Sequence, residues 1–146
     1  MKLNIINDYN PKLTYNLNSF KKITKKILND FNVKDINLSI ILSNKNLLNK
    51  LKKDYFNLNH FTDVIAFNLE EGRNPLDGEI YISIDDVLEN SEQYKVTFND
   101  EFKRVIIHGL LHLLGFKDET NKQKNKMTKL ENINMTFISK EIISLK

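Results

Sequence analysis

Cysteine is absent from this sequence of 146 residues. Its absence excludes a disulfide scaffold, a cysteine zinc site, an iron–sulfur site and thiol catalysis. Any metal must therefore be held by histidine and carboxylate side chains. Only 2 prolines and 4 glycines interrupt the chain, and so few breakers favour a fold with short loops.

Long apolar runs are also missing. No segment approaches the roughly 20 apolar residues that span a bilayer, and the first residues contain no apolar core of a secretory signal. We therefore expect a cytoplasmic protein that does not contact membranes. The length predicts a single domain over residues 1–146, and 40% hydrophobic residues suffice for one core.

The charge balance is only mildly basic, with 22 basic residues against 19 acidic ones. A net charge of +3 is a weak indication of a nucleic-acid partner. The lysine cluster Lys21, Lys22, Lys25 and Lys26 is interpreted as a solvated helix face, with an RNA-binding patch as the alternative. Charge alone therefore does not define a function.

Hydrophobic periodicity predicts strands and helices along the whole chain. Strands are expected over residues 3–6, 33–42, 62–67 and 78–84, and helices over 15–30, 44–55, 85–94, 100–114 and 121–139. In the helix from about Asp85, the expected buried stripe is Val87, Leu88 and Tyr94. This order predicts the α+β class, with a mixed sheet of about four strands, packed helices and a metal-site helix near the C-terminus.

Two of the 3 histidines, His108 and His112, lie four residues apart in the most apolar predicted helix. Residues at this spacing share one helical face, so both imidazoles can reach one ion. An unpaired polar group in an apolar setting costs about 1–3 kcal/mol, and a metal would supply one partner for both rings. Hydrogen-bonded core histidines are the alternative interpretation.

The pattern continues as H-x-x-x-H-x-x-G-x-x-D, with Gly115 and Asp118 at the last two defined positions. This is the register of the metzincin zinc motif with aspartate as third ligand, where glycine permits the chain to reverse. Three protein ligands leave a fourth position for water, as in catalytic zinc sites. We therefore predict one zinc ion per chain, bound by His108, His112 and Asp118. Gly109 stands where metzincins carry their general-base glutamate, which weakens a zinc peptidase interpretation.

Three motifs together resemble the YbeY family, the bacterial metal-dependent endoribonucleases of ribosomal RNA maturation. They are HGLLHLLGFKD at residues 108–118, TDVIAF at 62–67 and GEIYIS at 78–83, and the resemblance extends over about residues 44–130. It implies a zinc-dependent endoribonuclease specific for single strands, with ribosomal RNA near the small-subunit 3′ end as substrate. It also implies ribosome quality control as the setting and the small ribosomal subunit as partner, with no role for DNA.

The sequence departs from the family pattern at three positions. Asp118 replaces the third ligand histidine, which should make a metal-bound water less acidic, and Lys117 replaces the preceding acid. A family arginine about six residues before the T-D-V strand falls close to Phe56. If that arginine stabilises phosphate charge in relatives, the candidates to replace it here are His60, Lys52, Lys53 and Arg104.

Further side chains have weaker predicted roles. A metal-bound water is the expected nucleophile, and His60 is the candidate catalytic side chain, against the interpretation as a surface histidine. Asp63 is expected to order the start of its strand, and Glu119 to be a solvated loop acid. Met127 is expected in the core, and Phe116 is expected to pack over the turn.

Two functional hypotheses remain open from the sequence. The first is the zinc-dependent endoribonuclease. The second is a ribosome-associated RNA-binding assembly factor with a mainly structural metal, which the missing arginine and missing general base favour. The two differ in whether the fourth position at the metal is open or is closed by a fourth side chain.

Overall fold

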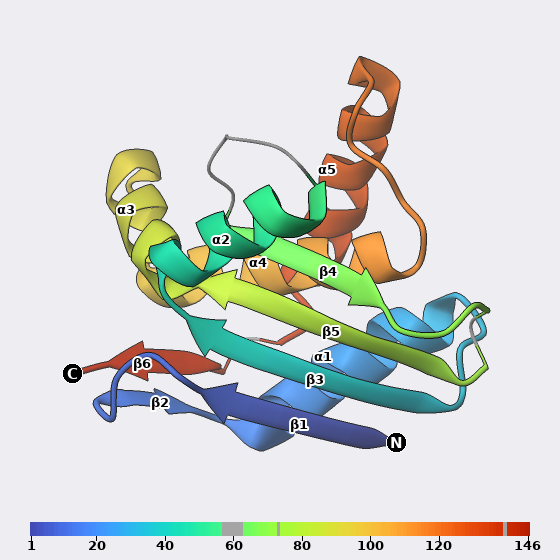
Figure 1. Cartoon of the computed structure of the whole chain (residues 1–146), viewed down its shortest axis with the longest axis horizontal. Coiled ribbons are helices and arrows are strands. Elements are labelled where there is room, and N and C mark those ends of the chain that lie inside the picture. Colours follow the sequence, from blue (N-terminus) through green and yellow to red (C-terminus); the bar gives the residue numbers. More distant parts are fainter. Residues whose placement is uncertain (57–62, 73, 139) are drawn as a thin grey trace.

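A mixed β-sheet forms the centre of the fold, with its strands in the order β1-β3-β5-β4 (Figure 1). The computed structural model describes residues 1–56, 63–72, 74–138 and 140–146. The strands span β1 (Lys2–Asn7), β3 (Ile36–Ser43), β4 (Val64–Asn68) and β5 (Leu76–Ser83). Strands β1, β3 and β5 are parallel, whereas β4 pairs antiparallel with β5 and forms one edge. The predicted four-stranded mixed sheet of an α+β fold is confirmed.

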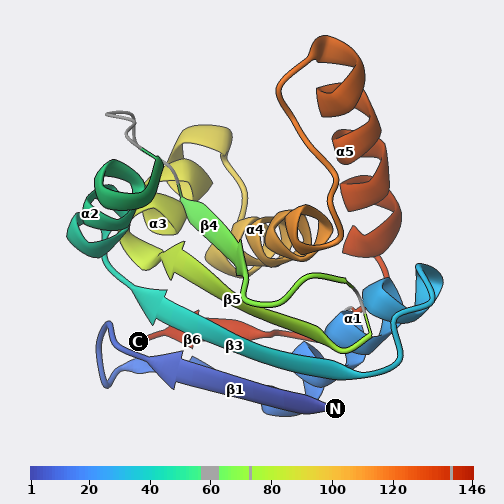
Figure 2. The ribbon, with the colours of Figure 1, turned by 45° about the vertical axis from the view of Figure 1, so that its right-hand side comes forward.

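Helices lie on both faces of this sheet. They span α1 (Leu17–Asp30), α2 (Lys45–Phe56), α3 (Ile84–Tyr94), α4 (Phe98–Leu113) and α5 (Asn121–Met135). Helix α4 packs on one face, because Gly109 lies against Val64 and Ile80. Helix α2 lies on the other face (Figure 2), where Tyr55 contacts Phe67, a residue of the opposite pleat to Val64. Helices α1 and α5 both contact α4, which in turn contacts strands β4 and β5.

The apolar stripe of α4 explains its central place. Ile106, Leu110 and Leu113 are buried and recur at helical spacing, as a core-facing helix requires. His108 and His112 lie beside this stripe and are half-buried, with 24% and 30% of their side chains exposed. The sequence therefore places both imidazoles at the border between the core and solvent.

Side-chain caps fix the starts of the helices. Asn44 caps α2, because its side chain accepts a hydrogen bond from the backbone N–H of Leu47 (2.9 Å). Thr97 caps α4 by accepting from the Asp100 N–H (3.1 Å). The nearby Asn99 side chain accepts backbone N–H bonds from Ile142 and Ile143 of the C-terminal segment. Such caps set where each helix begins and hence which face its side chains occupy.

A second, two-stranded sheet was not predicted. Strands β2 (Leu13–Tyr15) and β6 (Ile143–Leu145) pair antiparallel near the two ends of the chain. Each has only 3 residues, too few for an alternating pattern, and the pairing joins segments that lie far apart in sequence.

Two predictions about the helices are wrong. Tyr94, expected in the buried stripe of α3, is 59% exposed, because it is the last residue of the helix and extends beyond the core. Helix α5 ends at Met135 rather than at residue 139, and the chain then continues with Ile138 buried outside the helix. The Ile138 carbonyl accepts a hydrogen bond from the Lys103 ammonium (2.6 Å), which holds this non-helical segment against α4. None of the described helices is both long and apolar enough to cross a bilayer.

Candidate metal centre

The end of α4 and the turn after it bring three predicted ligand residues together. The Nε2 atoms of His108 and His112 lie 2.8 Å apart. The Asp118 Oδ2 atom lies 3.2 Å from Nε2 of His108 and 3.5 Å from Nε2 of His112. Three ligand atoms therefore converge on one point, with both histidines presenting the same ring nitrogen.

Gly115 makes this convergence possible. Its φ is +98°, which confirms the prediction that glycine lets the chain reverse at the end of the helix. Its N–H donates to the His112 carbonyl (2.9 Å) and the Phe116 N–H donates to the Leu111 carbonyl (3.1 Å), the two bonds of a Schellman motif. An added Cβ would meet nothing within 4 Å, so glycine is required for its backbone conformation and not for space. The reversal carries Asp118 back over the histidines.

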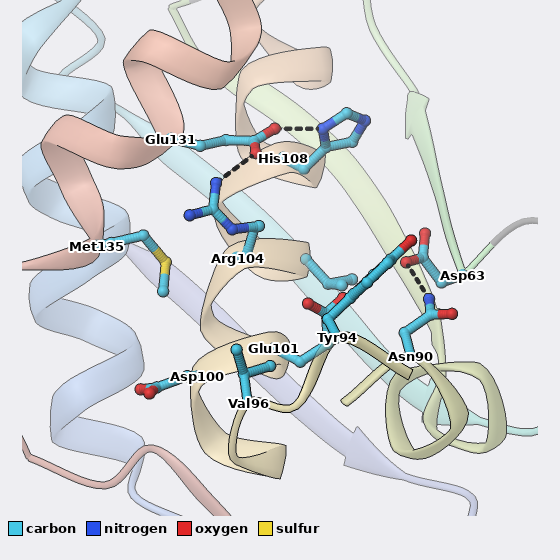
Figure 3. A pocket seen from close by; sticks show the side chains of 11 residues that line it. Asp63, Asn90, Tyr94, Val96, Asp100, Glu101, Arg104, His108, Glu131 and Met135 are labelled. Carbon is cyan, nitrogen blue, oxygen red and sulfur yellow. Dashed lines mark hydrogen bonds and ion pairs between the residues drawn. The ribbon is translucent and has the colours of Figure 1, made fainter. Parts of the chain in front are cut away.

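A buried carboxylate orients the His108 ring (Figure 3). Glu131, from α5, is 6% exposed, and its Oε2 lies 2.6 Å from Nδ1 of His108. Its Oε1 accepts a hydrogen bond from Arg104 (2.9 Å), so both carboxylate oxygens are used. With an acceptor at Nδ1, the ring carries its proton there and presents the lone pair of Nε2.

A backbone carbonyl orients the His112 ring. The Phe116 carbonyl oxygen lies 2.9 Å from Nδ1 of His112, so Nε2 again carries the lone pair. The Phe116 ring packs edge-on against Phe31 at the end of α1, with centroids 5.1 Å apart. This contact confirms that Phe116 packs over the turn, and it holds the carbonyl in place.

The two histidines differ in their electrostatics. Burial acts to lower the pKa of His108, but the hydrogen bond and charge of Glu131 outweigh it, so the pKa is raised above its usual value. Burial and then the charge of His108 lower the pKa of His112. Of the two rings, His108 is therefore the one that more readily becomes a charged imidazolium, and its charge disfavours a second charged ring at His112.

This donor set fits a divalent cation. Two nitrogen lone pairs and a carboxylate oxygen repel one another at 2.8–3.5 Å unless a cation lies between them. Bond lengths of about 2.0–2.1 Å in a tetrahedral zinc site separate the ligand atoms by about 3.3 Å, close to what is seen here. Within the described part of the chain, no fourth histidine or carboxylate joins the group, and Asp118 is 41% exposed. The group can therefore hold a metal with one side open to solvent.

Gly109 has a packing role that explains the missing glutamate. An added Cβ at this position would lie 3.1 Å from methyl carbons of Ile80 and Val64 in the sheet. A glutamate here would point into the core and away from the ligand atoms of His108 and His112. The metzincin arrangement of base and ligands is therefore incompatible with the packing of α4.

The residues that could replace the positive charge of the family arginine lie in different parts of the structure. His60 and the side chain of Phe56 lie outside the described residues. Lys52 lies near the site: burial lowers its pKa, while the charges of Asp118 and Asp63 act to raise it. Lys53 is exposed on α2. Arg104 is bonded to Glu131 and Asn132. Among the described candidates, Lys52 is the one whose charge interacts with that of Asp118, a predicted metal ligand.

The remaining predicted residues behave as expected. The Asp63 carbonyl accepts from the Ser83 N–H (2.9 Å), which orders the start of β4, and its carboxylate accepts from Asn90 (3.3 Å). Glu119 is exposed, and Met127 is buried in the core.

Sequence reasoning missed Glu131, the partner of His108. The sequence does indicate that Glu131 is buried, because it lies four residues after Met127. Residues four apart share a helix face, and Met127 was assigned to the core. An acid on that buried face needs a partner, and a histidine in the neighbouring helix supplies one. It also missed Glu101, a residue of α4 that is 6% exposed.

An open His-His-Asp group on an α+β scaffold defines a candidate metalloprotein, and comparison with known proteins narrows the class. Residues 5–139 match the family described as Endoribonuclease YbeY. A relative from Karelsulcia muelleri, named Endoribonuclease YbeY, is 42% identical over 106 residues, covering 73% of this chain and 74% of its own. A relative of the same name from Amoebophilus asiaticus is 37% identical over 134 residues, which cover 86% of this chain and 90% of the relative.

A solved structure has a similar fold. The solution structure of a Thermotoga maritima protein is similar with a TM-score of 0.62 and 26% identity, covering 91% of this chain and 86% of that one. The chain belongs to the YbeY endoribonuclease family, and the resemblance seen in the three sequence motifs is confirmed.

Proposed function

We propose that this chain is a zinc-dependent endoribonuclease that cuts single-stranded RNA, with His108, His112 and Asp118 as the zinc ligands. The observation that carries the proposal is the convergence of three lone-pair atoms at a solvent-open site, with both Nδ1 atoms held by acceptors. Membership of a family described as endoribonucleases supports the reaction.

The residues around the ligands have distinct roles in this proposal. When bound, zinc supplies a Lewis acid that lowers the pKa of a coordinated water to about 7 and polarises a phosphoryl oxygen. Glu131 holds the His108 ring in the tautomer and orientation that metal binding requires. Lys52, whose charge interacts with that of Asp118, binds the phosphate that is to be cut and offsets its charge. The half-exposed Asp118 leaves the RNA a path to the site.

Ribosomal RNA near the 3′ end of the small-subunit RNA is the proposed substrate, within ribosome assembly and quality control. The small ribosomal subunit is the proposed partner and the cytoplasm the proposed compartment. The family resemblance carries this part of the proposal, and the net charge of +3 is compatible with it. Binding through lysines to phosphates should weaken as salt rises.

A ribosome-associated RNA-binding assembly factor with a structural metal is the second candidate. Phe56 in place of the family arginine, and the bonding of Arg104 to Glu131 and Asn132, favour it, because both leave less positive charge for a transition state. Structural zinc sites have four protein ligands, whereas three donors converge among the described residues. The three-donor arrangement supports the enzyme over the assembly factor.

The test combines metal analysis with a nuclease assay. Purified wild-type protein and His112→Ala are compared for zinc content and for cleavage of a 5′-labelled single-stranded RNA. We expect one zinc per wild-type chain, and loss of both zinc and cleavage in His112→Ala while its thermal melting remains cooperative. Zinc-loaded wild-type protein that binds ribosomal particles but cuts no RNA, free or on them, would support the assembly factor instead.

A further inference from the structure

A cavity of about 470 Å³ lies directly beside His108 (Figure 3). Of the three proposed metal ligands, only His108 lines it. Side chains from α3, α4 and α5 and from the start of β4 line it. Its volume falls in the range of roughly 300–1,000 Å³ that is typical of small-ligand sites. Since His108 belongs both to the cavity and to the ligand group, an occupant of the cavity lies next to the reaction centre.

The lining of the cavity includes aliphatic side chains and an exposed aromatic ring. Val96, Val105 and Met135 contribute aliphatic surface. Tyr94 is 59% exposed at the end of α3, and in Figure 3 its side chain extends toward the side of the cavity where Asp63 and Asn90 lie. Exposed aromatic rings are the surfaces on which proteins stack the bases of single-stranded RNA.

The lining of the cavity is also rich in hydrogen-bond acceptors. Asp63 and Glu101 lie close enough that the charge of Asp63 contributes to raising the pKa of Glu101 to about 7, after burial as the larger cause. Arg104 lines the cavity too, but its guanidinium is bonded to Glu131 and Asn132. A phosphate would be repelled here, whereas a neutral group with N–H donors could bond the Glu101 carboxyl and the Asp63 oxygen that does not already accept from Asn90.

We propose that this cavity binds the base of the nucleotide next to the phosphate that is cut, and that it selects guanine. The proposal rests on the proposed ribonuclease function and adds a base preference to it. Guanine presents the N1–H and the N2 amino group side by side, a donor-only arrangement that matches the carboxyls of Asp63 and Glu101 when Glu101 is ionised. Adenine, cytosine and uracil each place an acceptor on the corresponding edge. The Tyr94 ring stacks on the base, while Lys52 near Asp118 binds the backbone.

The test has a binding arm and a cleavage arm. In the first, the full chain stripped of metal is titrated into fluorescein-labelled UUGUU, UUAUU, UUCUU and UUUUU, and anisotropy is recorded. We expect UUGUU to bind about tenfold more tightly than the others, because a bidentate contact to one base is lost when another base offers an acceptor in its place. Glu101→Gln, whose amide offers a donor as well as an acceptor, should bind all four alike. Tyr94→Ala should weaken all four about tenfold, and Tyr94→Phe, which keeps the ring, should bind as wild type does.

In the second arm, zinc-loaded protein cuts a random-sequence single-stranded RNA pool and the ends are sequenced. We expect guanine at one fixed position beside the cut for wild type and Tyr94→Phe, and loss of that preference for Glu101→Gln. Equal binding of the four pentanucleotides, preference for another base, or a Tyr94→Ala variant that binds like wild type would each overturn the base subsite. Cleavage without a base preference would overturn the subsite and leave the nuclease intact. Absence of cleavage with guanine-selective binding would instead overturn the nuclease.

Discussion

Glu131 gives the sharpest test of how the metal centre is built. Its two oxygens accept hydrogen bonds from two donors, Nδ1 of His108 at 2.6 Å and Arg104 at 2.9 Å. Glu131→Gln has the same shape, but its amide can accept only one of these bonds and turns an N–H toward the other donor. Glu131→Ala removes both. The substitutions therefore free the His108 ring without changing any of the three ligand atoms.

The expected loss is in metal affinity. Removing a carboxylate that orients a ligand histidine typically weakens metal binding about 10–100-fold, or about 1.4–2.8 kcal/mol. We expect a loss of zinc affinity near tenfold for Glu131→Gln, because one hydrogen bond is kept, and near 100-fold for Glu131→Ala. Because Arg104 is partly exposed, loss of its ion pair should reduce the free energy of unfolding by only about 1 kcal/mol.

Competition with a chelator of known zinc affinity measures the effect. Glu119→Gln is the matched control, because it removes the same charge from an exposed carboxylate one residue after Asp118. It should bind zinc nearly as wild type does. If both Glu131 variants remain folded and bind zinc as tightly as Glu119→Gln does, the buried carboxylate does not position His108 and the reasoning is refuted.

Four other predictions concern the surroundings of the site. Lys52→Ala combined with Lys53→Ala should weaken RNA binding in a fluorescence titration and reduce its salt slope by at most about 2, whereas an exposed lysine pair of α1 changed to alanine should have little effect. Gly115→Val should cost about 1–2 kcal/mol of backbone strain at φ +98° and weaken zinc binding. Gly115→Asn should retain more of the stability and more of the zinc affinity, and zinc titration of the two variants compares their affinities. Burial raises the pKa of Glu101 to about 7, so protonation stabilises the fold in acid and this stability is lost as pH rises from about 5 through 7. The free energy of urea unfolding of the metal-free wild type should therefore fall by about 2–3 kcal/mol relative to Glu101→Gln between pH 5 and pH 8. Phe56→Arg should raise the cleavage rate at unchanged RNA affinity if the missing family charge acts in the transition state, and single-turnover kinetics separate the two.

The parts of the site that are local in sequence could be predicted. His108, His112, Gly115 and Asp118 lie within one helix and its terminal turn, where spacing determines geometry. Glu131 lies 23 residues after His108, so its contact depends on how α5 packs against α4, which periodicity does not encode.

The misassigned elements have similar causes. Strands β2 and β6 are too short for a pattern and are stabilised by pairing across the whole length of the chain. Tyr94 has the spacing of a core residue, but it lies at the end of α3, where the helix extends past the core and into the rim of the cavity. Helical spacing shows which residues share a face and does not show how far along the helix the core extends.

Cleavage of a labelled single-stranded RNA during zinc titration of the metal-stripped protein tests the central proposal most directly. We expect no cleavage without zinc, a rate that rises with added zinc and saturates at one ion per chain, and no recovery in His112→Ala or Asp118→Asn. Cleavage by the stripped protein at the full rate, or recovery of wild-type activity in either variant, would contradict a metal-dependent nuclease built on these three residues.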